Sequence, residues 1–221
     1  MSFEVIRTKR KTVALIINSE GELIVRAPLQ TPNSYIEDLV IKKADWIRQT
    51  QERIRERNLL YPPLLCREGE WFPYLGQDYQ LEFNDYTGQI RLNDDRLLVP
   101  HGIDDVKATM ILWYKSKAKE VIVKRLDLYS KRLGLEYKAM RITNASRRWG
   151  SCSTKGTVNF SWRLVMCPLQ VIDYVVIHEL CHLKHHNHSQ EFWQTVGEYM
   201  PDYQIHRKWL ADNQRIMDIL Q

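Results

Sequence analysis

The sequence predicts an α+β protein, and three observations support this class. Three short runs rich in β-branched residues lie within the first 27 residues. A second cycle of strand patterns, from about residue 71 to 100, is followed by a long helical pattern. The carboxy-terminal third contains strand, turn and strand patterns before three helices. Strands and helices are therefore grouped, which is typical of α+β proteins.

The elements of the first half follow from residue type and spacing. The runs FEVIRT, TVALII and ELIVRA predict a small meander, because NSEG before the last run is favourable turn chemistry. Apolar residues spaced by threes and fours then predict a helix over about 34–57. The second cycle predicts strands in WFPYLGQDYQLEF and TGQIRLNDDRLLVP, and a helix over about 104–133.

The second half begins with predicted strands in YKAMRIT and GTVNFSWRLVM, joined by the polar turn NASRRWGSCSTKG. Pro168 suits the first position of a helix that runs to about His185. Two further helices are expected, at about 189–200 and 202–219.

We expect the chain to divide after residue 104. Residues 1–104 would form a β-rich region with one helix, and residues 105–221 would form the carboxy-terminal domain. The alternative is that the whole chain is one compact unit. GELIVRAP and DDRLLVP each precede a tryptophan-bearing helix, which is a weak indication of an internal repeat.

Composition is that of an ordinary globular protein, with 44% hydrophobic and 27% charged residues. The amino terminus lacks the apolar core of a signal peptide. The most apolar run, Val171 to Leu183, is interrupted by polar residues and is shorter than the roughly 20 residues of a membrane span. A cytoplasmic protein is therefore expected. Its four cysteines show no CxxC spacing and should be reduced.

The net charge of +5 is unevenly distributed. Residues 105–163 contain 14 Lys and Arg but only four Asp and Glu. This excess is either a solvated helical face or a surface that attracts phosphate or nucleic acid.

The motif HELCH carries the strongest chemical signal. His178 and His182 are four positions apart, so on a helix their imidazoles can converge on one metal ion. Glu179 lies to the side of the same face, where it can act on a water without binding the metal. The alternative is a pair of hydrogen-bonded core histidines. Burying two imidazoles and a carboxylate in so apolar a helix without a metal would be costly, however.

A third ligand must come from outside this helix. His185 and His186 point past the site, because a helix continued to those positions carries them too far along its axis or around it. His188 follows His182 by six residues, as in the HExxHxxGxxH motif, although His185 occupies the glycine position. Asn187 could supply a left-handed turn, and Ser189 is the expected cap of the next helix.

Several motifs resemble the YgjP-like metallopeptidase family, which is related to the SprT-like and WLM zincin-like peptidases. They are RWGSCS at 148–153, IDYVVIHELCHL at 172–183, NHSQEFW at 187–193 and MPDY at 200–203. The resemblance implies a zincin-like core of antiparallel strands followed by the HExxH helix and two more helices. It also implies that His178, His182 and His188 bind zinc and that Glu179 is the base.

The resemblance and the residues leave the substrate open. The first hypothesis is a zinc metallopeptidase in which Glu179 activates a zinc-bound water. Arg148 is the preferred further donor to the developing charge, ahead of Tyr203 and His206. Gly150 should allow the backbone to approach either the catalytic helix or the substrate.

The second hypothesis is a zinc-dependent nucleoside triphosphate pyrophosphohydrolase with a UTP-like substrate, an activity assigned to some YgjP-like proteins. Its phosphates would meet the cations Arg141, Arg147, Arg148 and Lys155. The third is a nucleic-acid-associated protease or binding module, in which the zinc is structural. A structural zinc normally has four protein ligands, which disfavours this hypothesis. Nickel or manganese would also suit imidazole ligands.

Overall fold

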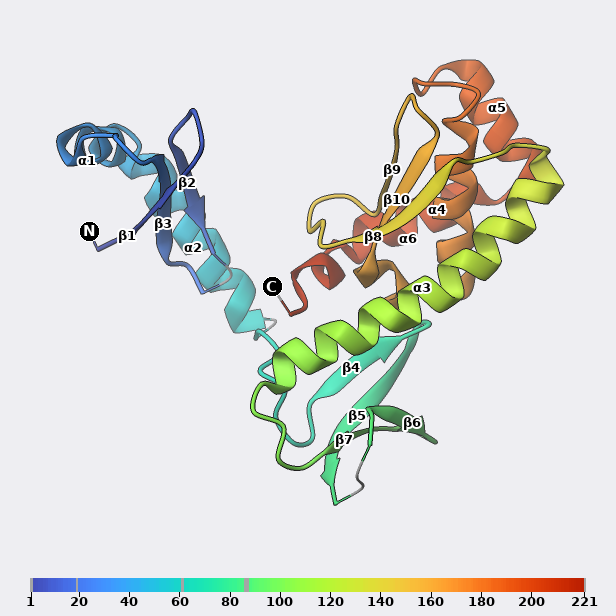
Figure 1. Cartoon of the computed structure of the whole chain (residues 1–221), viewed down its shortest axis with the longest axis horizontal. Coiled ribbons are helices and arrows are strands. Elements are labelled where there is room, and N and C mark those ends of the chain that lie inside the picture. Colours follow the sequence, from blue (N-terminus) through green and yellow to red (C-terminus); the bar gives the residue numbers. More distant parts are fainter. Residues whose placement is uncertain (1, 19, 61, 86–87, 221) are drawn as a thin grey trace. The chain divides into compact units, whose positions relative to one another are not determined.

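The computed structural model describes residues 2–18, 20–60, 62–85 and 88–220 (Figure 1). The chain folds into two compact units, Met1–Pro63 and Leu64–Gln221. The mixture of small sheets and helices confirms the α+β class.

The first unit contains a three-stranded sheet and two helices. Its elements are β1 (Glu4–Thr8), β2 (Ala14–Ile17), β3 (Leu23–Pro28), α1 (Asn33–Lys42) and α2 (Ala44–Leu60). Alternate residues of β3 are buried against α1 and α2, in a core made of Leu23, Val25, Ala27, Ile36, Val40 and Ile47.

This sheet is not the predicted meander, because its strand order is β1-β3-β2. β2 and β3 do pair as neighbours, and between them the Asn18 side chain accepts hydrogen bonds from the amides of Glu20 and Glu22; Ser19 of the predicted turn lies outside the described residues. β1, however, lies parallel to β3 on its other side. The Arg7 guanidinium explains this placement, since it donates to the carbonyls that follow β3 at Pro28, Leu29 and Thr31.

The second unit contains two sheets and the remaining helices. The first sheet has the order β4-β5-β7-β6, with β4 (Trp71–Tyr74), β5 (Gln77–Asn84), β6 (Arg91–Asn93) and β7 (Arg96–Pro100). The long helix α3 (Val106–Leu133) follows. The second sheet has the order β8-β10-β9, with β8 (Ala139–Thr143), β9 (Gly150–Cys152) and β10 (Thr157–Ser161). The last elements are η1 (Trp162–Met166), α4 (Leu169–Cys181), α5 (Gln190–Tyr199), α6 (Tyr203–Asp212) and η2 (Gln214–Asp218).

The second sheet corrects the expectation of antiparallel strands. β9 is antiparallel to β10, but β8 is parallel to β10. The connection from β8 crosses the carboxyl end of β10, where the Ser161 hydroxyl donates to the Ala145 carbonyl and the Ser161 amide to the Trp149 carbonyl. This crossing places β9 at the free edge of the sheet, next to α4.

One topology occurs three times along the chain. The sheets β1-β3-β2 and β8-β10-β9 and the strands β5-β7-β6 each have in the middle the strand that comes last in the sequence. This central strand is parallel to the strand that comes first in the sequence and antiparallel to the strand that comes second. The faint likeness of GELIVRAP and DDRLLVP has this structural counterpart, because β3 and β7 are the central strands of the first two groups.

The boundary between the units lies after residue 63, earlier than the expected division after 104. Strands β4 to β7 share one core with α3, since Phe72 and Leu97 pack in the same buried cluster as Met110. The buried Tyr114 of α3 also donates its hydroxyl hydrogen to the Pro73 carbonyl at 2.9 Å. The region 64–104 therefore belongs structurally to the carboxy-terminal unit.

An ion pair joins α3 to the helix that carries the site. The Arg125 guanidinium donates to both carboxylate oxygens of Asp173, with 2.6 Å between Nη2 and Oδ2. Asp173 is buried, at 6% exposure. Bidentate pairs of this kind fix orientation as well as distance. The pair therefore holds α4 against α3 five residues before His178.

We expect Arg125→Ala to lower the free energy of unfolding by roughly 2 kcal/mol. This is less than the 3–5 kcal/mol lost when a fully buried pair is broken, because the guanidinium stays partly exposed. Chemical denaturation would measure the loss. Lys124→Ala, which breaks an exposed pair with Glu120 on the same helix, should leave stability unchanged within error. Equal effects of the two changes would contradict a clamping role for Arg125.

Candidate active site

The helix that carries HELCH is shorter than expected. It begins directly after Pro168, as predicted, but α4 ends at Cys181 with His182 as its C-cap. The next amides bond three residues back, from Leu183 to Leu180 and from Lys184 to Cys181. The chain therefore leaves the helix before His185 and His186 instead of after them.

The loop between α4 and α5 returns His188 to the helix. The Nε2 atoms of His188 and His178 are 3.1 Å apart. The predicted left-handed Asn187 is not found, since its φ is not positive; its side chain instead accepts from the Ser189 amide. Because the helix already ends at Cys181, the chain reverses without a left-handed residue. Ser189 caps α5 as predicted, accepting from the Phe192 amide.

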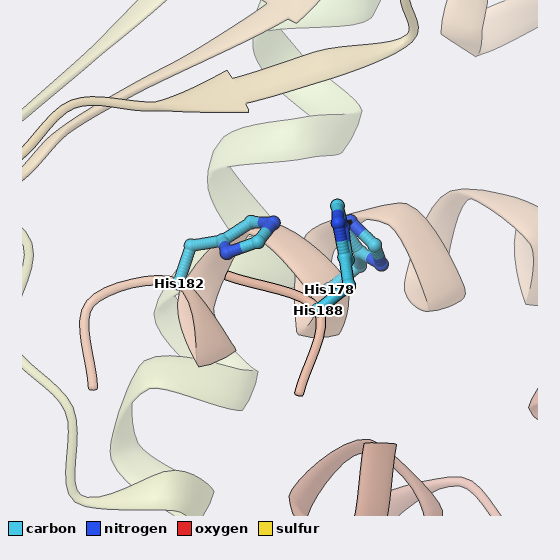
Figure 2. Close-up of side chains that lie close together, drawn as sticks. All are labelled: His178, His182 and His188. Atoms are coloured by element: carbon cyan, nitrogen blue, oxygen red, sulfur yellow. Dashed lines mark hydrogen bonds between the residues drawn. The ribbon is translucent and has the colours of Figure 1, made fainter. Parts of the chain in front are cut away.

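Three imidazoles meet at this place, as Figure 2 shows. One ligand atom from each of His178, His182 and His188 lies within 4.8 Å of the others. Two ligands at about 2.1 Å from a tetrahedral zinc are separated by roughly 3.4 Å, close to the observed Nε2–Nε2 distance. His185 and His186 lie outside this group: the His185 ring contacts the Thr195 hydroxyl, and His186 is exposed.

The surroundings of the rings suit a metal ion. Nδ1 of His182 lies 2.9 Å from the His185 carbonyl, which leaves its Nε2 for a ligand, the usual arrangement of metal-binding histidines. Nδ1 of His178 is buried without a hydrogen-bond partner. Burial, followed by the charges of His182, His188 and Arg207, lowers the pKa of His178 to about 3. The site thus favours the neutral imidazole that a metal requires.

Glu179 lies beside the three histidines but is not one of the group. Its side chain is buried, at 5% exposure, and its Oε2 has no hydrogen-bond partner. Burial raises the pKa of Glu179 to about 8, against the opposing charge of Arg148. An orphaned buried carboxylate is costly, so its retention beside the imidazoles points to a chemical role.

Gly150 of β9 makes room for this carboxylate. A β-carbon at Gly150 would lie 2.5 Å from Oε1 of Glu179 and 2.7 Å from its Cγ. Of the two roles expected for this glycine, the structure shows the close approach to the helix. The edge strand and the carboxylate are consequently in direct contact.

Three stacked or neighbouring aromatic rings adjoin the histidines. Tyr174, Trp193 and Tyr203, here called the ring stack, come from α4, α5 and α6. The Tyr203 ring is 5.2 Å from that of Trp193 and 6.4 Å from that of Tyr174, at interplanar angles of 16° and 17°. The Trp193 ring also stacks on His188 at 5.6 Å. His178 and His188 therefore contact the ring stack through Tyr174 and Trp193.

The three candidate donors to a developing charge have different positions. Arg148 is exposed and acts electrostatically on Glu179. Tyr203 belongs to the ring stack, while His206 lies 3.3 Å from the Asp202 carboxylate. Sequence reasoning missed Tyr174, Trp193 and Arg207; the motif NHSQEFW contains Trp193 and was the available signal for it.

The helix with its histidines, the returning His188 and the adjacent edge strand define a metallopeptidase-type site. The chain belongs to the YgjP-like metallopeptidase family, since residues 11–213 match the family described as "YgjP-like, metallopeptidase domain". The resemblance inferred from the sequence is thereby confirmed, and the family implies a metal-dependent hydrolase.

Among solved structures, the chain is similar to the metallopeptidase zymogen of Pyrococcus abyssi abylysin. The two are 24% identical, with a TM-score of 0.39, over 42% of this chain and 95% of the other. None of the curated proteins matches the chain. Over the described residues, no helix is both long and apolar enough to cross a membrane.

Proposed function

We propose that this protein is a zinc-dependent peptidase in which His178, His182 and His188 hold the metal and Glu179 is the general base. One observation carries the proposal: three imidazoles converge beside a buried carboxylate that is not part of their group. Three protein ligands leave a coordination position open, which is typical of catalytic and not of structural zinc.

The chemistry is divided among the metal and the neighbouring side chains. When bound, zinc would polarise the substrate carbonyl and acidify a water molecule. Glu179 would take the proton from that water and pass it to the leaving amine. Arg148, on the β9 side, would neutralise charge that develops on the attacked oxygen.

The edge of β9 supports a peptide as the substrate. β9 pairs with β10 through Cys152, Ser151 and Gly150, and its other edge carries no strand among the residues that the structure describes. An extended peptide can add to such an edge through backbone hydrogen bonds. Because Gly150 contacts Glu179, a peptide bound there would run past the catalytic carboxylate.

Nucleotide hydrolysis is the second candidate function. It is favoured by the cationic residues of the segment 138–155 and by the electrostatic effect of Arg148 at Glu179. Arg141, Arg147 and Lys155 are exposed. We place the peptide first because the edge of β9 beside Glu179 offers a site for an extended backbone.

A substrate screen tests the proposal. The zinc-loaded full chain would be incubated with an unbiased peptide mixture, casein and the nucleoside triphosphates, with and without a chelator. We expect chelator-sensitive peptide cleavage, detected by mass spectrometry, and no release of pyrophosphate. Pyrophosphate release without peptide cleavage would replace the peptidase by the nucleotide hydrolase.

The third ligand can be tested without any substrate. His188→Ala should weaken zinc affinity by roughly 100-fold or more, because two imidazoles from one helix leave the ion underligated. Competition with a chromogenic chelator would measure this affinity. His186→Ala removes an exposed imidazole two positions away and is the matched control. Unchanged zinc affinity in His188→Ala would remove this residue from the site.

A further inference from the structure

Arg207 lies at the border of the candidate active site. It follows Tyr203 by one turn of α6. Its Cζ is 4.8 Å from the centre of the Trp193 ring. That ring is in turn 5.8 Å from the ring of His178 and 5.6 Å from that of His188. The Trp193 ring is therefore a neighbour both of the Arg207 guanidinium and of two proposed metal ligands, His178 and His188.

The position of Arg207 leaves its hydrogen-bond donors available. Its neighbours on α6 are paired with carboxylates, His206 with Asp202 and Lys208 with Asp212. Among the described residues, no carboxylate lies within ion-pair distance of Arg207, which is exposed and held by the Trp193 ring. Stacking on an aromatic face orients a guanidinium while its planar edge stays free.

Arg207 is joined to the site through Trp193. Its Cζ lies 4.8 Å from the centre of the Trp193 ring, which stacks on the rings of Tyr203 and His188. Arg148 lies just before β9, whose Gly150 closely approaches Glu179. Of the two cations, only Arg207, on the ring stack, has no role in the proposed chemistry.

We propose that Arg207 binds a carboxylate of the substrate on the ring-stack side of the metal, and so makes the enzyme prefer acidic peptides or free carboxyl termini. The inference rests on the peptidase function proposed above and adds its specificity. A guanidinium edge matches a carboxylate with two parallel hydrogen bonds. The aromatic surface beside Arg207 suits the apolar parts of a peptide, and a triphosphate is kept as a competing ligand in the test.

Binding to a non-hydrolysing protein tests the inference. Zinc-loaded Glu179→Gln full chain would be titrated by calorimetry with three peptides of otherwise equal sequence. One has an internal Glu and an amidated end, one has Gln in its place and an amidated end, and one has Gln and a free carboxyl terminus. Inorganic triphosphate is the fourth ligand. We expect one or both carboxylate peptides to bind roughly tenfold or more tightly than the neutral peptide.

Substitution then assigns the preference to Arg207. Arg207→Met keeps an apolar stem over Trp193 and should abolish the preference, and Arg207→Lys should retain only part of it. Lys208→Met removes the same charge from the same helix and should change nothing. The inference is overturned if the preference survives in Arg207→Met, if Lys208→Met abolishes it equally, or if only triphosphate binding depends on Arg207.

The same peptides separate this inference from the proposed function. If the wild-type protein cleaves all three peptides and binding shows no carboxylate preference, the peptidase stands and the role of Arg207 falls. If binding depends on Arg207 but the wild-type protein cleaves none of the peptides, the carboxylate site stands and the peptidase falls.

Discussion

Gly150→Ala is expected to reduce hydrolysis by at least roughly 100-fold although it alters neither a metal ligand nor the proposed base. The new β-carbon would lie 2.5 Å from Oε1, 2.7 Å from Cγ and 2.8 Å from Cδ of Glu179. The carboxylate or the edge strand must therefore move, and a displacement of about 1 Å of a catalytic group can cost about this factor. Turnover of any substrate found in the screen measures the loss.

The matched control is Gly197→Ala in α5. A β-carbon there would meet Cε1 of Tyr203 at 3.8 Å, an ordinary contact. Alanine also favours a helix over glycine by up to about 1 kcal/mol, so activity and stability should be kept or slightly improved. Zinc content should stay near one ion per chain in both variants. Full activity in Gly150→Ala would show that the approach of β9 to Glu179 has no catalytic consequence.

Local geometry made part of the site predictable. The spacing of His178 and His182 on a helix determines that both rings lie on one face, whatever the rest of the fold does. The same geometry placed Glu179 beside them. His188 was accessible through its spacing, but the reason assigned to its return was wrong, because the end of α4 at Cys181 and not a left-handed Asn187 reverses the chain.

Long-range packing decided the features that sequence patterns did not reveal. Whether β8 lies parallel or antiparallel to β10 depends on how residues 144–149 cross Ser161, and no periodicity encodes that crossing. The ring stack requires α4, α5 and α6 to meet, so it could not be inferred from any one helix. The α+β class was predictable because it depends only on the order of the local patterns.

Glu179→Gln is the prediction that separates catalysis from metal binding. Glutamine has nearly the same shape as glutamate but cannot accept the proton. Loss of a positioned general base costs roughly 10²–10⁴-fold in rate. The three histidines are unchanged, so zinc affinity should stay close to that of the wild-type protein. Steady-state hydrolysis and chelator competition on the same preparation measure the two quantities.

Stability should not fall in this variant. Glu179 is buried with an orphaned Oε2, and burial raises its pKa to about 8, so folding near pH 7 requires the carboxylate to take up a proton or to be buried charged; a neutral amide avoids both costs. Denaturation of the metal-free protein should therefore give a free energy of unfolding equal to or above that of the wild type. A protein that keeps its fold and its zinc but loses hydrolysis would identify Glu179 as the base. Retained hydrolysis at the wild-type rate would exclude that role and require another proton acceptor beside the histidines.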